Sequence, residues 1–359
     1  LHYFNRDVEF QMPMNIGLLT CLQTLELFNV GKKKGRQIEE LRCLKNLKGK
    51  LVIRNLQLVN SKEGAERANL CGKPNLLNLE FLWSHKNAES DNVEGDVLEG
   101  LRPHPNLQEL YICGFMGDRF PYWFMSLTKL VDLSLIDCST SKELPAGLGQ
   151  LPFLQKLEFS GLENVRYIGP SFYGIDDDFG KVGGQLEVLS RTFFRALNVL
   201  TLKNMGNLVE WMEPDINVFP MLEILTIEDC SKLTTAPSHF PSLKILEITK
   251  NDHVSVVKKI LSKVSTTLSS LTIIGNTGMT GLTCLSDVAP GLIGKNLHNL
   301  KSLTLRKCPD LTRLEVCSTS LQNLELIHCE NLRELPEDLC RFQALRNLEM
   351  IGCPRIHSI

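Results

Sequence analysis

The sequence contains no C-x-x-C pair, although it has twelve cysteines, and it has no Asn-x-Ser/Thr sequon. The first absence leaves no signal for a zinc site or a redox pair. The second is unusual for a secreted repeat protein, because such sequons accept N-linked glycans. Together they favour a reducing compartment inside the cell. We therefore expect a cytoplasmic protein with free cysteines.

Long apolar runs and an excess of charge of one sign are also missing. No apolar stretch approaches the length needed to span a bilayer. The formal net charge of −2 leaves no electrostatic footprint for nucleic acid or a membrane surface. The first residues do not form a signal peptide. The chain begins with Leu1 rather than Met, so we expect it to be a piece of a longer protein.

Motifs for catalysis and cofactor binding are sparse. No G-x-x-x-x-G-K-[ST] phosphate loop occurs, although Gly72-Lys73 and Gly294-Lys295 stand in isolation. The eight histidines show no spacing to Cys or Asp that indicates a metal site or a catalytic triad. We expect this chain to have no catalytic, metal-binding or cofactor-binding residues and not to be an enzyme.

The sequence does contain a repeated pattern of leucines. Residues 300–311 read L-x-x-L-x-L-x-x-C-x-x-L, and the pattern returns from Leu321 and from Leu345. This pattern is the signature of a leucine-rich repeat. The L-x-L segment alternates apolar and polar residues, as a half-buried strand does. One such strand cannot bury its leucines alone, but stacked repeats form a continuous core and pair their strands.

Thirteen repeats can be placed by taking the first leucine of each strand as its anchor, and most spacings lie near the usual range of about 20–29 residues. The anchors are Leu25, Leu51, Leu79, Leu110, Leu133, Leu157, Leu200, Leu225, Leu246, Leu271, Leu303, Leu324 and Leu348. We predict an α/β solenoid, a leucine-rich-repeat horseshoe with a parallel inner β-sheet and an irregular or short-helical convex side. The single domain covers 1–359, with a partial entry repeat at 1–21, about thirteen repeats in 22–359 and a long loop at 161–194.

The segments between strands differ in type. Apolar residues at helical spacing predict helices within 252–267, 92–101 and 61–70. The long loop contains Asp176-Asp177-Asp178 and several glycines, so we expect it to be flexible and acidic.

Five cysteines lie five residues after an anchor, where the chain turns inward and a side chain can bond to backbone groups of the turn. They are Cys138, Cys230, Cys308, Cys329 and Cys353. We expect Cys308, Cys329 and Cys353 to be buried, reduced and stacked in neighbouring coils.

Four stretches carry a resemblance to a known family. Gly49–Leu70 with Leu79-Glu80-Phe81-Leu82-Trp83 is similar to its early repeats, and Gly114–Trp123 resembles its Phe-Pro-x-Trp turn. Tyr167–Gly174 resembles its Ile-Gly-x-x-Phe-Tyr-Gly loop, and Cys308-Pro309 resembles its last repeats. The family is the leucine-rich-repeat region of plant intracellular immune receptors of the coiled-coil, nucleotide-binding type. The resemblance covers nearly the whole chain.

The resemblance implies a function in pathogen sensing. The repeats would recognise a pathogen effector or a guarded host protein, restrain the receptor's own nucleotide-binding domain, or do both. ADP or ATP is expected only in upstream domains that this chain does not contain. Two alternatives from other classes are the substrate-recognition arm of a ubiquitin ligase and a scaffold unrelated to immunity. A phosphate loop encoded upstream of Leu1 would discriminate between these classes.

Exposed strand positions supply the candidate binding residues. A column of glutamates follows the anchors, and we interpret it as a solvated face rather than as acid–base machinery. It consists of Glu26, Glu80, Glu158, Glu247, Glu325 and Glu349. Trp83 and Tyr111 lie at or near strand positions facing the same way, where aromatics could anchor a protein. Phe120 and Trp123 are instead expected to pack the convex layer.

The same face is expected to carry a charge pattern along its length. Lys50 and Arg54 lie in early coils beside the two aromatics, and further charged residues follow in the middle and late coils. With the aromatics, the protein-binding candidates are Trp83, Tyr111, Asp137, Glu158, Lys203, Glu228, Arg306, Lys307 and His328. A partner would be bound through rim charges and a few aromatic anchors.

Overall fold

The computed structural model describes residues 11–84, 93–175 and 192–356, except 216, 264–266, 276–278, 280, 286–298, 315, 317 and 336–341. The chain divides into two compact units, Leu1–Ser141 and Lys142–Ile359. Each unit is built from successive coils, and the L-x-L segment of each coil forms a strand that runs parallel to its neighbours. This repeated arrangement of parallel strands is the predicted leucine-rich-repeat solenoid.

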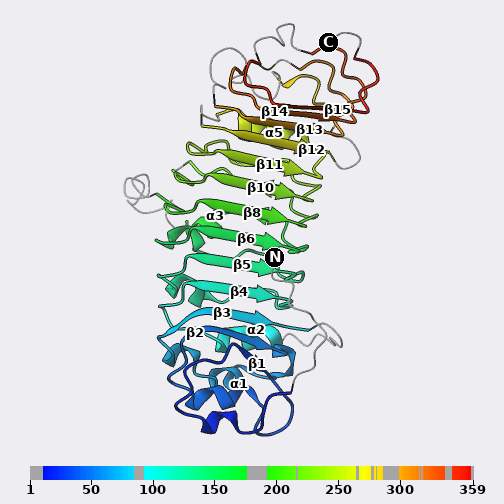
Figure 1. The fold of residues 1–359 in the computed structure, drawn as a ribbon. Helices are drawn as coiled ribbons and strands as arrows, with labels where there is room; N and C mark the ends of the chain where they lie inside the picture. The colour runs from blue at the N-terminus through cyan, green and yellow to red at the C-terminus, as the bar shows by residue number, and fades with distance from the viewer. Residues whose placement is uncertain are drawn as a thin grey trace. The chain divides into compact units, whose positions relative to one another are not determined.

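Among its described residues, the first unit contains five parallel strands. These are β1 (Leu27–Asn29), β2 (Gly49–Arg54), β3 (Leu76–Leu82), β4 (Glu109–Cys113) and β5 (Asp132–Ile136). Figure 1 shows β2, β3, β4 and β5 as neighbouring arrows that point the same way. Short helices return the chain from one strand to the next: η1 (Ile16–Leu18), η2 (Ile38–Cys43), η3 (Leu56–Leu58), α1 (Lys62–Glu66), η4 (Leu70–Gly72), α2 (Val93–Gly100) and η5 (Tyr122–Ser126).

Eight parallel strands of the same kind lie in the part of the second unit that the structure describes. These are β6 (Lys156–Ser160), β8 (Val199–Lys203), β10 (Ile224–Glu228), β11 (Ile245–Thr249), β12 (Ser270–Ile274), β13 (Ser302–Arg306), β14 (Asn323–Ile327) and β15 (Asn347–Ile351). Figure 1 shows β8, β10 and β11 side by side. A second sheet pairs β7 (Tyr167–Ile168) with β9 (Glu210–Trp211), and the described helices are η6 (Leu148–Gln150), α3 (Pro170–Tyr173) and α5 (Val254–Leu261).

The strands alternate buried and solvent-facing residues as predicted. In β5, Leu133 and Leu135 are fully buried, while Ser134 between them is half-buried. The same alternation holds in β6, β8 and β10 to β14. In β15, Leu348 is 45% exposed because no described coil packs on its far side.

The first anchor was placed wrongly. β1 begins at Leu27, which pairs with Val52, so Glu26 rather than Leu25 lies opposite the anchor Leu51. Phe28 is fully buried, whereas Leu25 and Leu27 remain half-exposed. The large ring of Phe28 fills the core, and this shifts the register by one residue, which exchanges the two faces of the strand. Glu26 is therefore not a member of the glutamate column.

A turn with positive φ follows most strands and directs the chain inward. It lies at the residue directly after the strand, a backbone conformation that glycine, asparagine and aspartate adopt most readily. The residues are Gly114, Asp137, Gly161, Asn204, Asp229, Lys250, Lys307, His328 and Gly352. Three predicted binding residues, Asp137, Lys307 and His328, therefore occupy a turn position that is set by the repeat.

The cysteine column lies directly after this turn. Cys138, Cys230, Cys308 and Cys329 are fully buried, as predicted for the last two, and no described cysteine forms a disulfide. Their sulfurs lie near backbone carbonyls. For example, the sulfur of Cys329 lies 3.7 Å from the carbonyl oxygen of Leu305. Cys353, in the coil of β15, is half-buried rather than buried because its coil is covered on one side only. That the thiols are unreactive in the folded protein stays a prediction.

The 161–194 excursion was predicted as a loop, but its first part has defined structure. β7 and α3 lie within it, while Asp176–Asp178 are outside the described residues. Phe172 and Tyr173 of α3 join an aromatic stack that runs through the second unit. Phe194 lies 4.9 Å from Phe172 between ring centroids, and Phe219 lies 5.0 Å from Phe194.

All three predicted helices are present in the return segments, at α1, α2 and α5, although each is shorter than its predicted range. Glu213, in the coil of β8, connects α5 to Ser238 in the coil of β10. Its carboxylate accepts hydrogen bonds from the backbone N–H of Ser238 (3.0 Å) and from Lys259 Nζ (2.7 Å). Burial alone would raise the pKa of Glu213, but the hydrogen bonds from Lys259 and Ser238 outweigh it and lower the pKa to about 2.

This lowered pKa predicts an acid-dependent contribution to stability. The folded pKa of Glu213 lies below its ordinary value of 4.5, so the carboxylate stabilises the fold above pH 4.5. That contribution is lost as the pH falls toward 2. Glu213→Gln should lower the urea midpoint at pH 7, and its difference from wild type should shrink between pH 4.5 and pH 3. The exposed Glu163→Gln is the control, and an equal effect there would exclude this role.

Candidate functional site

Glu80, Tyr111 and Ser134 lie next to one another on the solvent-facing side of the strands in the first unit. They are direct partners on β3, β4 and β5. Lys50 Nζ forms an ion pair of 2.5 Å with Glu80. Tyr111 is half-buried, and burial raises the pKa of its hydroxyl far above the ordinary value, with Cys113 beside it contributing. The phenol therefore stays protonated at neutral pH and offers a hydrogen-bond donor beside the paired Glu80.

Trp83 does not lie on this face, contrary to the prediction. Its side chain is only 6% exposed and packs edge-on against Phe115, with ring centroids 5.4 Å apart. Trp83 directly follows β3 and continues its alternation with the buried Leu79 and Phe81, so the indole points into the core. Trp123 is buried as predicted, and its Nε1 donates to Leu98 O over 3.1 Å. Tyr111 alone remains as an aromatic candidate on this side.

In the second unit, charges on the solvent-facing side neutralise one another between coils. Lys203 Nζ and Lys250 Nζ each lie 3.6 Å from the carboxylate of Glu228, and Lys250 also lies 3.8 Å from Asp229. The predicted binding residues Lys203 and Glu228 therefore belong to a mixed charge network. Such a network screens long-range charge and leaves short-range polar contacts for a partner.

The remaining predicted residues are distributed along the second unit. Glu158 lies on β6 opposite Thr201. Arg306 on β13 forms an ion pair of 2.7 Å with Glu325 of β14. Lys307 and His328 are exposed at the turns that follow β13 and β14. Arg306 and Lys307 are thus adjacent in sequence but differ in setting, because only the first lies within a strand.

An apolar strip on the same side was missed by the sequence analysis. Val199, Ile224 and Ile245 are direct partners on β8, β10 and β11, and all three are half-exposed. They occupy the position before the anchor, where β6 carries Lys156 and β12 carries Ser270. Aligning that position across the repeats would have revealed the strip, because apolar residues there contrast with polar ones in neighbouring coils.

The buried Lys73 is a structural residue rather than part of a phosphate site. Its side chain is fully buried, and Nζ donates to the carbonyls of Leu41 (2.7 Å) and Leu44 (2.9 Å). These carbonyls lie at the end of η2, so the ammonium caps that helix. Burial lowers the pKa of Lys73 to about 8.

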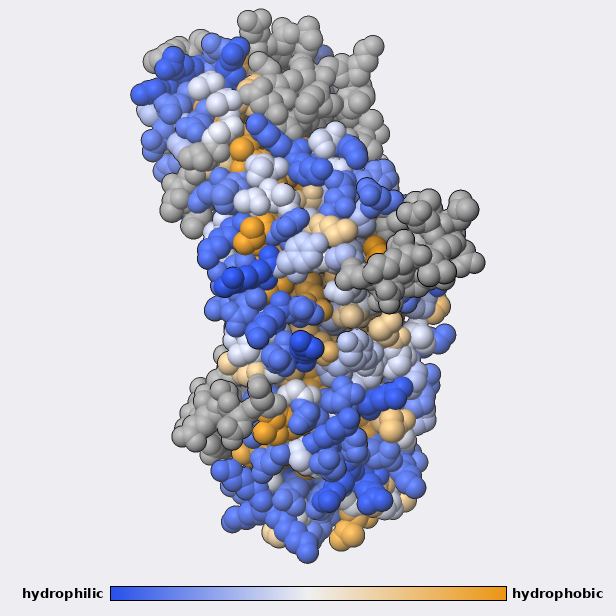
Figure 2. Space-filling model, turned by 180° about the vertical axis from the view of Figure 1, so that it is seen from behind, coloured by the Kyte–Doolittle hydropathy of each residue, from blue (hydrophilic) through white to orange (hydrophobic). Residues whose placement is uncertain are grey.

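Within the described parts of the chain, no group of three or more His, Cys, Asp or Glu is arranged to hold a metal ion. No helix there combines the length and the apolar character of a membrane span. Figure 2 shows one face of the molecule, on which hydrophobic residues occur in small groups between hydrophilic ones. That distribution is typical of a surface that meets water, with contact areas of limited size.

Coils of parallel strands with buried leucine columns define a leucine-rich-repeat protein, a fold that is typically a protein-interaction scaffold. A family model described as R13L1/DRL21 LRRs matches residues 38–162. The disease resistance RPP13-like protein 1 of Arabidopsis thaliana is 33% identical over 337 residues, which cover 86% of this chain and 30% of that protein. Disease resistance protein RGA2 of Solanum bulbocastanum is 33% identical over 83% of this chain and 27% of that protein.

The chain is a leucine-rich-repeat region of the plant disease-resistance protein family. It spans less than a third of the length of these relatives. Among solved structures, the leucine-rich-repeat domain of the type III effector XopL has a TM-score of 0.30 at 18% identity, covering 73% of this chain and 66% of that domain.

Proposed function

We propose that this chain is the protein-binding recognition and autoinhibition domain of a cytoplasmic plant immune receptor. Its partner is a pathogen effector or a guarded host protein, and in the resting receptor the same surface binds the receptor's own nucleotide-binding domain. The chain itself has no catalytic role. The nucleotide, ADP or ATP, is bound outside it and belongs to the upstream domains.

The apolar strip of Val199, Ile224 and Ile245 is the observation that carries this proposal. It lies on three adjacent strands, and the charge network of Lys203, Glu228 and Lys250 lies at the end of the same strands. An apolar strip at the start of the strands and charged residues at their far end together have the composition of a protein–protein interface. The strip supplies affinity by burying apolar area, and the charged residues select the partner. The membership of the disease-resistance family supports the immune context.

The test co-expresses this chain with the nucleotide-binding domain encoded by the same gene, as separate polypeptides. Ile224→Arg with Ile245→Arg should weaken their association at least tenfold, because charged side chains would interrupt the apolar strip. In the intact receptor the same pair should give activity without a pathogen, measured as cell death in leaves. Arg306→Glu with Lys307→Glu is a second arm, and it should act in the same direction.

Ser270→Arg with Ser302→Arg is the matched control. These serines occupy the same position on the next strands, β12 and β13, outside the apolar strip. Association and resting activity that respond equally to both pairs would show that the strip has no special role. If neither pair nor the Arg306 and Lys307 reversal changed either measurement, autoinhibition through this face would be excluded.

A further inference from the structure

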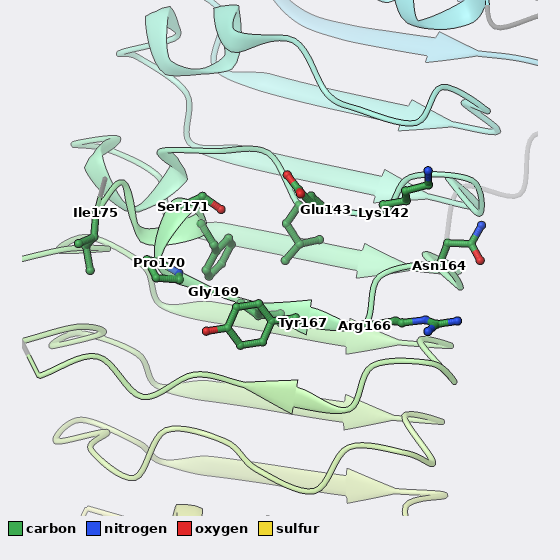
Figure 3. Close-up of a pocket in the computed structure, with 12 residues that line it drawn as sticks. Lys142, Glu143, Asn164, Arg166, Tyr167, Gly169, Pro170, Ser171 and Ile175 are labelled. Atoms are coloured by element: carbon green, nitrogen blue, oxygen red, sulfur yellow. The ribbon is translucent and has the colours of Figure 1, made fainter. Parts of the chain in front are cut away.

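A pocket of about 660 Å³ opens in the second unit, away from the solvent-facing side of the strands. Residues 142–144 form one wall, and β7 with α3 forms the other (Figure 3). Its apolar wall consists of Leu144, Ile168 and Phe172, which are 6%, 1% and 2% exposed. Polar side chains border this apolar wall.

Two cations and an amide lie together at one end of this pocket. Figure 3 shows Lys142, Asn164 and Arg166 at that end. Lys142 and Arg166 occupy the same position in two successive repeats. The next two repeats have Val209 and Thr234 at that position. Both are exposed, and neither forms an ion pair with any residue the structure describes. Two like charges at one end of the pocket, with Glu143 as the pocket's acidic residue, favour an anionic group at that end.

An aromatic ring lies next to the cationic end. Tyr167 is 44% exposed, and its hydroxyl lies 3.1 Å from the sulfur of Met212. The ring lies over Gly169, where an added Cβ would meet Tyr167 Cε1 at 2.2 Å. Gly169 therefore lets the ring lie flat against the backbone, beside the apolar wall. The arrangement offers an aromatic surface on which an apolar side chain can pack.

We propose that this pocket docks an extended segment of a partner protein in which an aspartate or glutamate adjoins an aromatic or aliphatic side chain. The guanidinium of Arg166 matches a carboxylate in geometry, and Lys142 and Asn164 add further donors. The apolar neighbour packs against Tyr167 and Phe172. Glu143 lies on the Ser171 side of the pocket in Figure 3 and repels a second carboxylate there, which orients the segment.

A protein segment fits better than a free inorganic anion. An ion such as phosphate would use the cationic end and leave the Tyr167 ring, which is 44% exposed, without a partner for its apolar face. The pocket is also open along one side. An extended peptide can enter and leave such an open site, whereas small-molecule sites are usually enclosed. This second site goes beyond the proposed function, since it lies outside the apolar strip and uses different residues.

The test uses the 359-residue chain and a fluorescein-labelled peptide, acetyl-Gly-Ser-Asp-Phe-Asp-Leu-Ser-Gly-amide, followed by fluorescence anisotropy. A second peptide replaces both aspartates with asparagine, and a third replaces phenylalanine and leucine with serine. We expect both to bind at least tenfold more weakly than the first. Lys142→Glu with Arg166→Glu should weaken binding of the first peptide at least tenfold.

Two further variants distinguish binding in the pocket from a general effect of the protein's charge. Arg195→Glu with Lys258→Glu makes the same charge change at exposed residues outside the pocket and should leave affinity within twofold. Gly169→Ala should weaken binding severalfold without altering charge, because its Cβ displaces the Tyr167 ring. Circular dichroism of each variant checks that the fold is kept. Ile224→Arg with Ile245→Arg should bind the peptide as wild type does, so failure of the strip and failure of the pocket are distinguishable.

Three results would overturn the proposal. The first is no binding of the acidic–aromatic peptide at millimolar concentration. The second is unchanged binding in the Lys142 and Arg166 reversal. The third is complete displacement of the peptide by millimolar inorganic phosphate, which would make the pocket an anion site only.

Discussion

Leu303→Ala is expected to lower the free energy of unfolding of the second unit by about 2–5 kcal/mol. Leu303 is fully buried on β13 and pairs directly with Leu271 of β12 and Leu324 of β14. The substitution therefore leaves a cavity between three coils, and the rigid strand ladder allows little collapse to fill it. Urea denaturation followed by circular dichroism measures the loss, and hydrogen exchange of β12 to β14 locates it.

Lys301→Ala is the control two residues away on the same coil. Lys301 is exposed and contributes only its backbone to the ladder, donating to Ser269 O over 2.8 Å. Its replacement should cost less than about 0.5 kcal/mol. Equal losses from the two variants would mean that Leu303 is not a core residue shared by the three coils.

The strands could be predicted because the repeat imposes the same physical demand on every coil. A two-residue alternation such as Leu133, Ser134 and Leu135 buries one face and exposes the other, so one register satisfies all neighbouring strands. The failure at Leu25 follows from the same rule. Phe28 competes with Leu27 for the inward position, and leucine spacing alone does not reveal that the larger ring is buried.

The candidate site was predicted less well, because its properties depend on neighbours that are distant in sequence. Lys203 and Glu228 are far apart in the sequence, but adjacent strands place Lys203 Nζ 3.6 Å from the Glu228 carboxylate. Trp83 is a different case, because it continues the alternation of the buried Leu79 and Phe81, and that alternation in the sequence already places its side chain inward. The pocket beside Tyr167 depends on Lys142 and Arg166 meeting across two coils, which became visible only with the structure.

The two proposed surfaces have different sequence origins. The apolar strip arises within the regular strand, at the position before the anchor, where Ile224 and Ile245 depart from the polar residues of other coils. The pocket arises where a return segment carries β7 and α3. A substitution in one surface can therefore leave the other unchanged, because the two surfaces share no residue.

The aromatic stack of the second unit is the other element with a large expected contribution. Phe219 is fully buried at its centre, with ring centroids 5.0 Å from Phe194 and 5.8 Å from Phe240. Trp211 meets the same ring edge-on at 5.8 Å. Because these residues come from successive coils, the stack ties together return segments that the strand ladder does not reach.

Phe219→Ala should therefore lower the free energy of unfolding by about 3–5 kcal/mol. The loss combines the buried area of the ring with aromatic contacts worth about 0.5–1.5 kcal/mol each. Phe153→Ala removes the same ring at a position that is 48% exposed, and it should cost less than about 1 kcal/mol. Trp211 is the only tryptophan of the second unit, and its emission reports directly on the stack. A Phe219 variant that unfolds at the wild-type urea concentration, with unchanged Trp211 emission, would show that the return segments are held by the strand ladder alone.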